Sequence, residues 1–322
     1  MLLGQTEKGE TETEAGDRSI PAAITDTGCE RDLNEDRYAV VESPSGLAWL
    51  VCDGMGGATG GELAAQLAID AIRRDLENLP PRPAEEALRN AVLEANRVIV
   101  LRRQNQAFAQ MGTTIVGAMF DGPEVVIAHV GDSRAYLIRD GAIQQLTIDH
   151  TYVQELVDKG HIKPEDALSH PQAHILTRAI GSEPALELSM QQYWVCETAA
   201  GEIPDQLVLC TDGLYSQVSE TEVATIVTDE APQGACVRLV ELAKARGGYD
   251  NISVAIIPLG GQLKQEPPVG YDRRKALERK RPRANQAKSG RSLLRTLAVV
   301  AVLSILAALV TVVGVMTFGV GQ

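Results

Sequence analysis

The stretch LAWLVCDGMGG, residues 47–57, places an aspartate directly after an apolar run. Residues 47–52 have the composition of a β-strand, and Asp53 stands at its end. This arrangement recurs three times, with Asp132 after VVIAHVG, Asp212 after QLVLCT and Asp250 before NISVAII. At any one point, Asp and Gly could simply end a strand and form a turn. The recurrence instead favours carboxylates that converge on one rim, where Mg²⁺ or Mn²⁺ takes oxygen ligands.

The other predicted elements surround this strand. Strand-like runs occur at 37–43, 47–52, 113–120, 124–130, 134–138, 206–211 and 252–257. Helical periodicity fits 61–78, 83–104, 219–229 and 233–246. The helices come in adjacent pairs, unlike the regular alternation of strand and helix in a doubly wound sheet. We therefore expect helix pairs to cover both sides of a stack of mostly antiparallel sheets.

The last apolar segment predicts a membrane anchor. Residues 297–318 read LAVVAVLSILAALVTVVGVMTF and contain no charged side chain. As a helix they would span about 33 Å, close to the hydrocarbon thickness of a bilayer. The segment is apolar on all sides, which favours a transmembrane helix over a buried core helix with one polar stripe. By the positive-inside rule, the basic residues before it keep the preceding domain in the cytoplasm, so we expect a single-pass protein of the cell membrane.

The net charge of −13 combines two regions of opposite sign. Residues 273–295 contain ten Lys or Arg against the single acid Glu278, a net charge of +9, which leaves −22 for the rest of the chain. An acidic main body argues against nucleic-acid binding, which depends on Lys and Arg. The position of the basic run beside the apolar segment favours attraction to anionic lipid headgroups.

Composition also predicts the domain boundaries. Residues 1–18 are polar and are expected to form a disordered tail. One folded domain is expected over 19–258, followed by a basic flexible linker over 259–296 that leads to the apolar segment. The five cysteines lie far apart and form no C-x-x-C pair, which is typical of reduced thiols in the cytosol.

Six motifs together resemble the PP2C (PPM) family of metal-dependent protein serine/threonine phosphatases, in its bacterial form. In the family's order they are RDLNED at 31–36, VCDGMGG at 51–57, GTT at 112–114, GDSR at 131–134, TDG at 211–213 and DNIS at 250–253. The segment from 149 to about 186 looks like the flap of bacterial members. The resemblance implies an α+β fold, a four-layer αββα sandwich of two antiparallel sheets flanked by helix pairs, which agrees with the order of elements above.

The resemblance also implies a centre of two Mn²⁺ or Mg²⁺ ions that activates a water for attack on phosphorus. Asp53 matches the carboxylate that bridges the two ions. The backbone carbonyl of Gly54 matches a further ligand. Asp212 and Asp250 match the ligands of one ion, and Glu35 and Asp36 match groups on the side of the other, partly through water. Arg31 matches the guanidinium that holds the substrate phosphate, a geometry that its planar fork suits.

Two positions depart from the family pattern. Met55 stands where eukaryotic members have a histidine that can protonate the leaving group, and methionine has no proton to donate. The candidates that remain are water or a flap histidine (His150, His161, His170 or His174), although histidines in loop-rich regions are more often structural. Ser216 stands where many members have a second aspartate for a third ion, for which Asp132 matches the remaining ligand. We expect any third ion to bind weakly.

The implied function is hydrolysis of phosphoserine and phosphothreonine on proteins, which reverses signalling by serine/threonine kinases. The expected partners are these kinases and their substrates. One alternative is a non-catalytic module of the same fold that binds phosphoproteins or senses a signal, although Asp53, Asp212 and Asp250 are all present. Another is a two-metal hydrolase of small phosphate esters, but such sites usually include histidine ligands and no histidine lies in the metal motifs.

Overall fold

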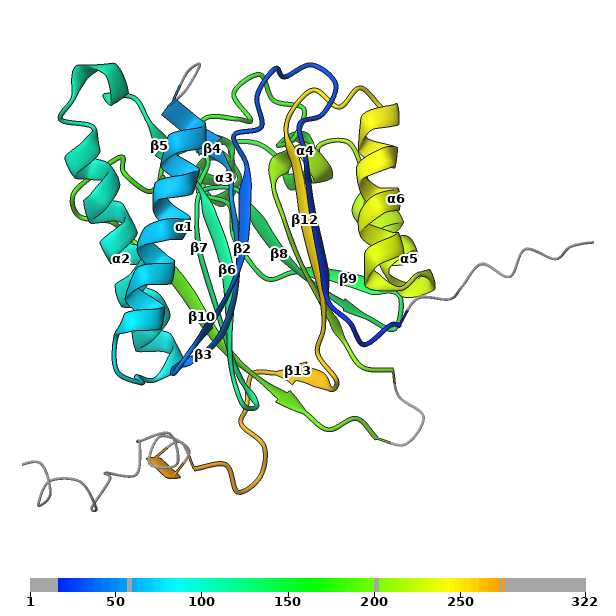
Figure 1. Cartoon of the computed structure of the whole chain (residues 1–322). Helices are drawn as coiled ribbons and strands as arrows, with labels where there is room; N and C mark the ends of the chain where they lie inside the picture. The colour runs from blue at the N-terminus through cyan, green and yellow to red at the C-terminus, as the bar shows by residue number, and fades with distance from the viewer. Residues whose placement is uncertain (1–16, 57–59, 200–202, 273, 276–322) are drawn as a thin grey trace, which may run out of the picture. The chain divides into compact units, whose positions relative to one another are not determined.

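Two antiparallel β-sheets form the centre of the computed structural model, which describes residues 17–56, 60–199, 203–272 and 274–275 (Figure 1). The five-stranded sheet has the order β1 (Ala22–Asp26), β12 (Ile252–Pro258), β11 (Gln206–Cys210), β8 (Arg134–Arg139) and β9 (Ala142–Gln145). The six-stranded sheet has the order β13 (Gln262–Lys264), β10 (Ser189–Cys196), β7 (Glu124–Val130), β6 (Ile115–Asp121), β3 (Gly46–Cys52) and β2 (Arg37–Ser43). The short strands β4 (Gly54–Met55) and β5 (Gly112–Thr113) pair with each other.

Helix pairs cover the outer faces of the two sheets. Helices α1 (Gly60–Asn78) and α2 (Ala84–Arg102) lie outside the six-stranded sheet, and α5 (Glu220–Asp229) and α6 (Pro232–Ala245) lie outside the five-stranded sheet (Figure 1). The shorter helices are α3 (Tyr152–Asp158), α4 (Asp212–Tyr215) and the 3₁₀ turns η1 (Gln106–Phe108) and η2 (Pro164–Asp166). The described residues therefore confirm the predicted αββα sandwich.

The position of strand β3 between two hydrophobic cores explains why its sequence is apolar without interruption. Leu50 and Cys52 belong to the hydrophobic core beneath α1 and α2. Trp49 and Val51, on the opposite face of the strand, belong to the core between the two sheets. Because successive side chains point to opposite faces of a sheet, a strand with a covering layer on each side has no solvent-facing position left for a polar residue.

The folded domain continues beyond the boundary predicted at Pro258. Strand β13 pairs with β10, and Leu263 is buried in the core between the sheets. The backbone N–H of Leu263 donates to Asp205 Oδ2 at 2.6 Å, and the Arg139 guanidinium donates to the same carboxylate. The predicted boundary was wrong because three residues supply too short a pattern to indicate a strand in the sequence.

The two ends of the chain fall largely outside the described residues. Arg18, predicted to lie in a disordered tail, donates to the carbonyls of Thr228 and Asp229 at 2.9 and 2.6 Å, so the folded domain begins slightly earlier than expected. No helix within the described ranges is long and apolar enough to cross a membrane. The predicted transmembrane segment, residues 297–318, lies outside those ranges.

Candidate active site

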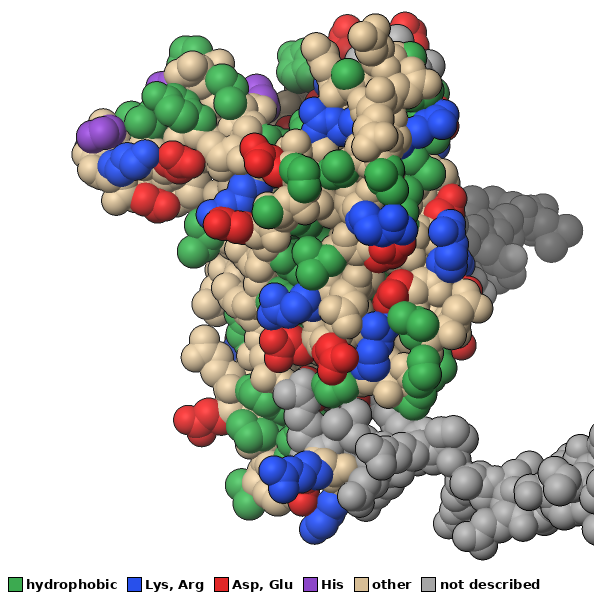
Figure 2. Space-filling model, turned by 90° about the vertical axis from the view of Figure 1, so that its left-hand side faces the viewer, with side chains coloured by type: hydrophobic (Ala, Val, Ile, Leu, Met, Phe, Trp, Pro, Cys, Tyr) green, Lys and Arg blue, Asp and Glu red, His purple; other side chains and the backbone are tan. Residues whose placement is uncertain are grey.

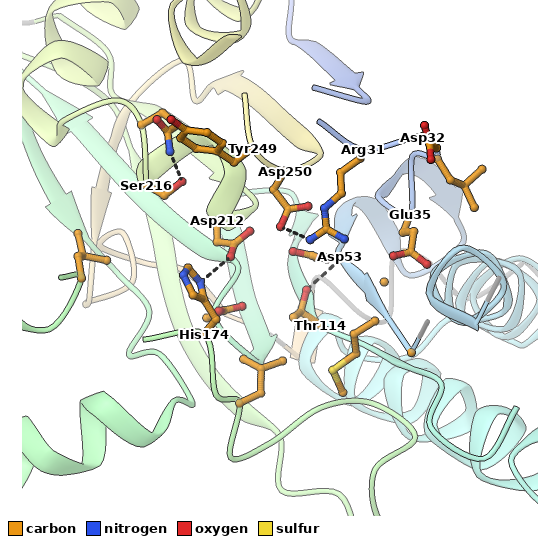
Figure 3. Close-up of a pocket in the computed structure, with 18 residues that line it drawn as sticks. Arg31, Asp32, Glu35, Asp53, Thr114, His174, Asp212, Ser216, Tyr249 and Asp250 are labelled. Atoms are coloured by element: carbon orange, nitrogen blue, oxygen red, sulfur yellow. Dashed lines mark hydrogen bonds and ion pairs between the residues drawn. The ribbon is translucent and has the colours of Figure 1, made fainter. Parts of the chain in front are cut away.

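A cavity of about 1040 Å³ gathers most of the predicted site residues. Seven of the eight line it, namely Arg31, Glu35, Asp53, Gly54, Asp132, Asp212 and Asp250. Figure 3 shows Asp53, Asp212 and Asp250 directed toward a common space, with Arg31 beside them. The prediction that carboxylates at strand ends converge on one rim is confirmed in this geometry.

Strand pairing explains why these carboxylates meet. Strands β3 and β7 both pair antiparallel with β6, so their carboxyl ends, which precede Asp53 and Asp132, lie at the same edge of the six-stranded sheet. Strands β11 and β12 are antiparallel neighbours, with Cys210 opposite Val254. The end of β11, before Asp212, and the start of β12, after Asp250, therefore lie together at one edge of the other sheet.

Two threonines fix the backbone of Asp53. Its N–H donates to Thr114 Oγ1 at 3.0 Å, and its carbonyl accepts from Thr114 N and Thr113 Oγ1, each at 2.8 Å. Thr114 Oγ1 lies 2.7 Å from Ser133 Oγ, which joins Asp53 to the loop that carries Asp132. In the sequence, GTT at 112–114 is one of the six family motifs but carries no predicted role in the site. Hydroxyl side chains at the start of a buried strand need a polar partner, and this requirement could have indicated that the two threonines hydrogen-bond to another segment.

Glu35 reaches the cavity because the backbone of Gly61 lies directly beside its carboxylate. A Cβ on Gly61 would lie 2.6 Å from Glu35 Oε1, so only glycine leaves room for this carboxylate at the start of α1. The N–H of Glu35 donates to Asn251 Oδ1 at 2.7 Å. Asn251 Nδ2 in turn donates to the carbonyls of Thr27 and Leu33. This asparagine therefore ties the loop that carries Glu35 to the residue directly after Asp250.

Asp36 is the predicted ligand that does not line the cavity. It is completely buried, and its Oδ2 accepts hydrogen bonds from Thr211 Oγ1 at 2.8 Å and Ser253 Oγ at 2.7 Å. These hydroxyls belong to the residue before Asp212 and to strand β12. Asp36 therefore lies behind the cavity wall and holds together the segments that bear two other predicted ligands.

Two cationic side chains contact the carboxylates of the cavity. Arg31 Nη2 donates to Asp250 Oδ2 at 2.8 Å, while the side chain of Arg31 remains 48% exposed and so within reach of a ligand. His174 Nδ1 lies 3.6 Å from Asp212 Oδ2, a contact that raises the pKa of the histidine. Met55 and Ser216, the departures from the family pattern, also line the cavity.

The other flap histidines lie elsewhere. His150 stacks on His129 with ring centroids 4.6 Å apart, and burial lowers the pKa of His150 to about 3. His161 and His170 are not among the residues that line the cavity. Of the four histidines considered in the sequence, His174 alone lines the cavity.

Burial and mutual repulsion hold protons on this acidic cluster. Burial, opposed by two hydroxyl hydrogen bonds and reinforced by repulsion from Asp212 and Asp250, raises the pKa of Asp36 to about 7. Burial and repulsion from Asp212 raise the pKa of Asp132 to about 8. The pKa of Asp53 is also raised, by burial and then by repulsion from its acidic neighbours. Carboxylates arranged in this way bind a cation in competition with protons.

The residues present fit divalent cations with oxygen ligands. Three buried carboxylate oxygens have no hydrogen-bond partner among the described residues, namely Glu35 Oε1, Asp36 Oδ1 and Asp212 Oδ1. The donors are all oxygens, as Mg²⁺ and Mn²⁺ prefer. Within the described ranges, no three acidic, histidine or cysteine side chains lie close enough to enclose an ion by themselves. Backbone carbonyl and water oxygens would have to complete the coordination, as is usual for Mg²⁺.

Residues 30–236 match the family model described as Protein phosphatase 2C. The chain belongs to the protein phosphatase 2C family. The serine/threonine phosphatase stp of Listeria welshimeri is 36% identical over 240 residues, which cover 72% of this chain and 93% of that protein. The expected enzyme class, a protein serine/threonine phosphatase, is confirmed.

Solved structures of serine/threonine phosphatases agree with the fold. The crystal structure of the Mycobacterium tuberculosis phosphatase PstP/Ppp is 36% identical, with a TM-score of 0.66 over 74% of this chain and 98% of that one. The PstP catalytic domain in complex with two manganese ions is 34% identical, with a TM-score of 0.62 over 74% of this chain and 96% of that one. The family match over residues 30–236 includes all the predicted site residues that line the cavity except Asp250.

We expect the metal-free protein to lose stability as the pH rises. A carboxyl whose pKa is raised by folding makes the free energy of unfolding fall as the pH rises from its unfolded pKa of 3.8 to its folded pKa, here about 7 for Asp36 and about 8 for Asp132. In EDTA, the melting temperature of the chain ended after Leu277 should fall by roughly 5 °C between about pH 6 and about pH 8. Asp53→Asn should reduce this fall by removing a charge. Equal pH dependence of the melting temperature in the wild-type protein and in Asp53→Asn would contradict repulsion between these carboxylates.

Proposed function

We propose that this protein hydrolyses phosphoserine and phosphothreonine on other proteins at a centre of two Mn²⁺ or Mg²⁺ ions. The observation that carries the proposal is the convergence of Asp53, Asp212 and Asp250 on one cavity with the exposed guanidinium of Arg31. The metal-bound PstP structure among the similar proteins supports the dependence on metal. Mn²⁺ and Mg²⁺ accept the same oxygen ligands, so either ion fits this centre.

Each residue has a proposed place in this centre. Asp53 would bridge the two ions, with the Gly54 carbonyl as an additional ligand, and Asp212 and Asp250 would hold one of them. Glu35 would serve the other ion directly or through water. Asp36, which lies behind the wall, would act by fixing the segments beside Asp212 and Asp250. Asp132 would contribute to a weak third ion, because the neutral hydroxyl of Ser216 is a poorer ligand than a carboxylate.

Arg31 would bind the phosphate of the substrate. Its ion pair with Asp250 is solvent-exposed and therefore weak, so the guanidinium can exchange a carboxylate for a phosphate oxygen. The bound cations would supply the positive charge that activates a water and neutralises the phosphoryl oxygens. Met55 has no proton to donate, so we propose that the leaving oxygen takes its proton from water in the open cavity.

Activity should depend on divalent metal and on Asp53. Phosphate release from a phosphothreonine peptide should occur with Mn²⁺ and should stop in EDTA. Asp53→Asn should lower kcat/KM by a factor of about 1000 or more, because the proposed bridging ligand loses its charge. The measurement is steady-state phosphate release at a saturating concentration of Mn²⁺.

A matched control separates this effect from general loss of charge. Asp140 is an exposed aspartate in the turn between β8 and β9 with a positive φ of 50°, a conformation that asparagine tolerates. Asp140→Asn should leave the rate unchanged. A folded wild-type protein that released no phosphate at any Mn²⁺ concentration would contradict the proposal and favour the non-catalytic module.

We also propose that residues 297–318 anchor the enzyme in the cell membrane, with the folded domain in the cytoplasm and kinases and their substrates as partners. The support is the uncharged apolar sequence and the basic run before it. When expressed in bacteria, the full-length protein should remain in the membrane pellet after an alkaline carbonate wash, whereas the chain ended after Leu277 should be found in the supernatant. Release of the full-length protein by carbonate would contradict the anchor.

A further inference from the structure

An exposed tyrosine stands at the rim of the cavity. Tyr249 lines the cavity and is 62% exposed. Figure 3 shows Tyr249 and Arg31 on opposite sides of Asp250. An aromatic ring in water leaves a large apolar surface uncovered, and such a surface beside a binding site is suited to contact with a ligand.

The backbone holds this ring in a defined position. Gly247 has a φ of +129°, and a Cβ at this residue would lie 2.5 Å from Cε2 and Cζ of the Tyr249 ring. The ring therefore packs directly on the backbone of Gly247, in a space that only glycine leaves free. A side chain held in this way loses less conformational entropy when it meets a ligand than a freely rotating one would.

The loop that carries Tyr249 is joined to the loop that carries Arg31. The backbone N–H of Cys29 donates to the carbonyl of Gly248 at 2.7 Å. Two residues further along each loop, the Arg31 guanidinium donates to the carboxylate of Asp250 at 2.8 Å. Because backbone contacts fix the two loops to each other, the fold sets the distance between the aromatic ring and the proposed phosphate-binding guanidinium.

The flap adds a second apolar surface to the same cavity. Leu168, which follows η2 in the flap, is 56% exposed and lines the cavity, and Leu176 lines it as well. Figure 2 shows a projecting lobe on which histidine and several hydrophobic side chains are exposed. Among the described residues, the exposed histidines belong to the flap, namely His161 and His174. Apolar side chains from two separate parts of the chain therefore border a cavity whose floor is acidic.

We propose that Tyr249 is a specificity-determining residue that packs against an apolar side chain directly adjacent to the phosphorylated residue of the substrate. This inference rests on the proposed function, because it requires Arg31 to hold the phosphate of a peptide. An extended peptide advances roughly 3.5 Å per residue, so a phosphate at Arg31 leaves the neighbouring side chains near the rim of the cavity. The preferred substrates are then phosphoproteins with an aliphatic or aromatic residue next to the phosphothreonine.

Three peptides test the inference. They contain the same phosphothreonine with leucine on its N-terminal side, leucine on its C-terminal side, or glycine on both sides, and kcat/KM is measured with Mn²⁺ on the full-length protein in a mild non-ionic detergent. One of the leucine peptides should exceed the glycine peptide by about tenfold, the effect of burying much of one aliphatic side chain. Tyr249→Ser should bring this ratio close to one, whereas Tyr249→Phe should retain it because the ring is kept.

Tyr38 provides a matched control for loss of an exposed tyrosine. It lies on β2, is 40% exposed and does not line the cavity, so Tyr38→Ser should keep both the rates and the preference. Equal kcat/KM for the three peptides, or an unchanged preference in Tyr249→Ser, would overturn the inference while the phosphatase activity stands. Failure to hydrolyse any of the peptides would overturn the proposed function and this inference with it.

Discussion

Repulsion between carboxylates that are held close together is the constraint on which the rest of this domain depends. Asp53, Asp132 and Asp212 line one cavity, and Asp36 is buried behind its wall. Left uncompensated, their charges would drive the ends of the strands apart. The fold resists this with neutral hydrogen bonds. The hydroxyls of Thr211 and Ser253 donate to the carboxylate of Asp36, and Thr114 fixes the backbone of Asp53. A divalent cation removes the repulsion directly.

The architecture also separates what must be rigid from what must meet a substrate. Four of the carboxylates follow or precede strands that are paired on both sides, so their backbones are fixed by the sheets, namely Asp53, Asp132, Asp212 and Asp250. The contacts to a peptide would instead come from loops and the flap, where Arg31, Leu168 and Tyr249 keep exposed side chains. This division allows related enzymes to keep one centre and vary the surface around it.

The sequence predicted the two-sheet architecture and the gathering of carboxylates at strand ends because both leave strong local patterns. A strand such as β3, buried on both faces, is apolar throughout, and an aspartate at its end stands out. Strand β13 left no comparable pattern, because its position depends on Asp205, 58 residues away. The roles of Thr114 and Gly61 could not be predicted either, since each depends on a contact between segments distant in sequence. The place of Asp36 behind the wall likewise follows only from its hydrogen bonds to Thr211 and Ser253.

Calorimetric titration with Mn²⁺ tests the central claim most directly, because it observes the ions themselves and requires no substrate. Near neutral pH, in buffers of different ionisation enthalpy, the protein should bind two ions per chain and release protons as the raised carboxyl pKa values are overcome. Asp53→Asn should weaken the binding of both ions, because the carboxylate of Asp53 would be a ligand of each. Binding without proton release, or full binding of both ions in Asp53→Asn, would contradict a centre built on repelling carboxylates that share Asp53.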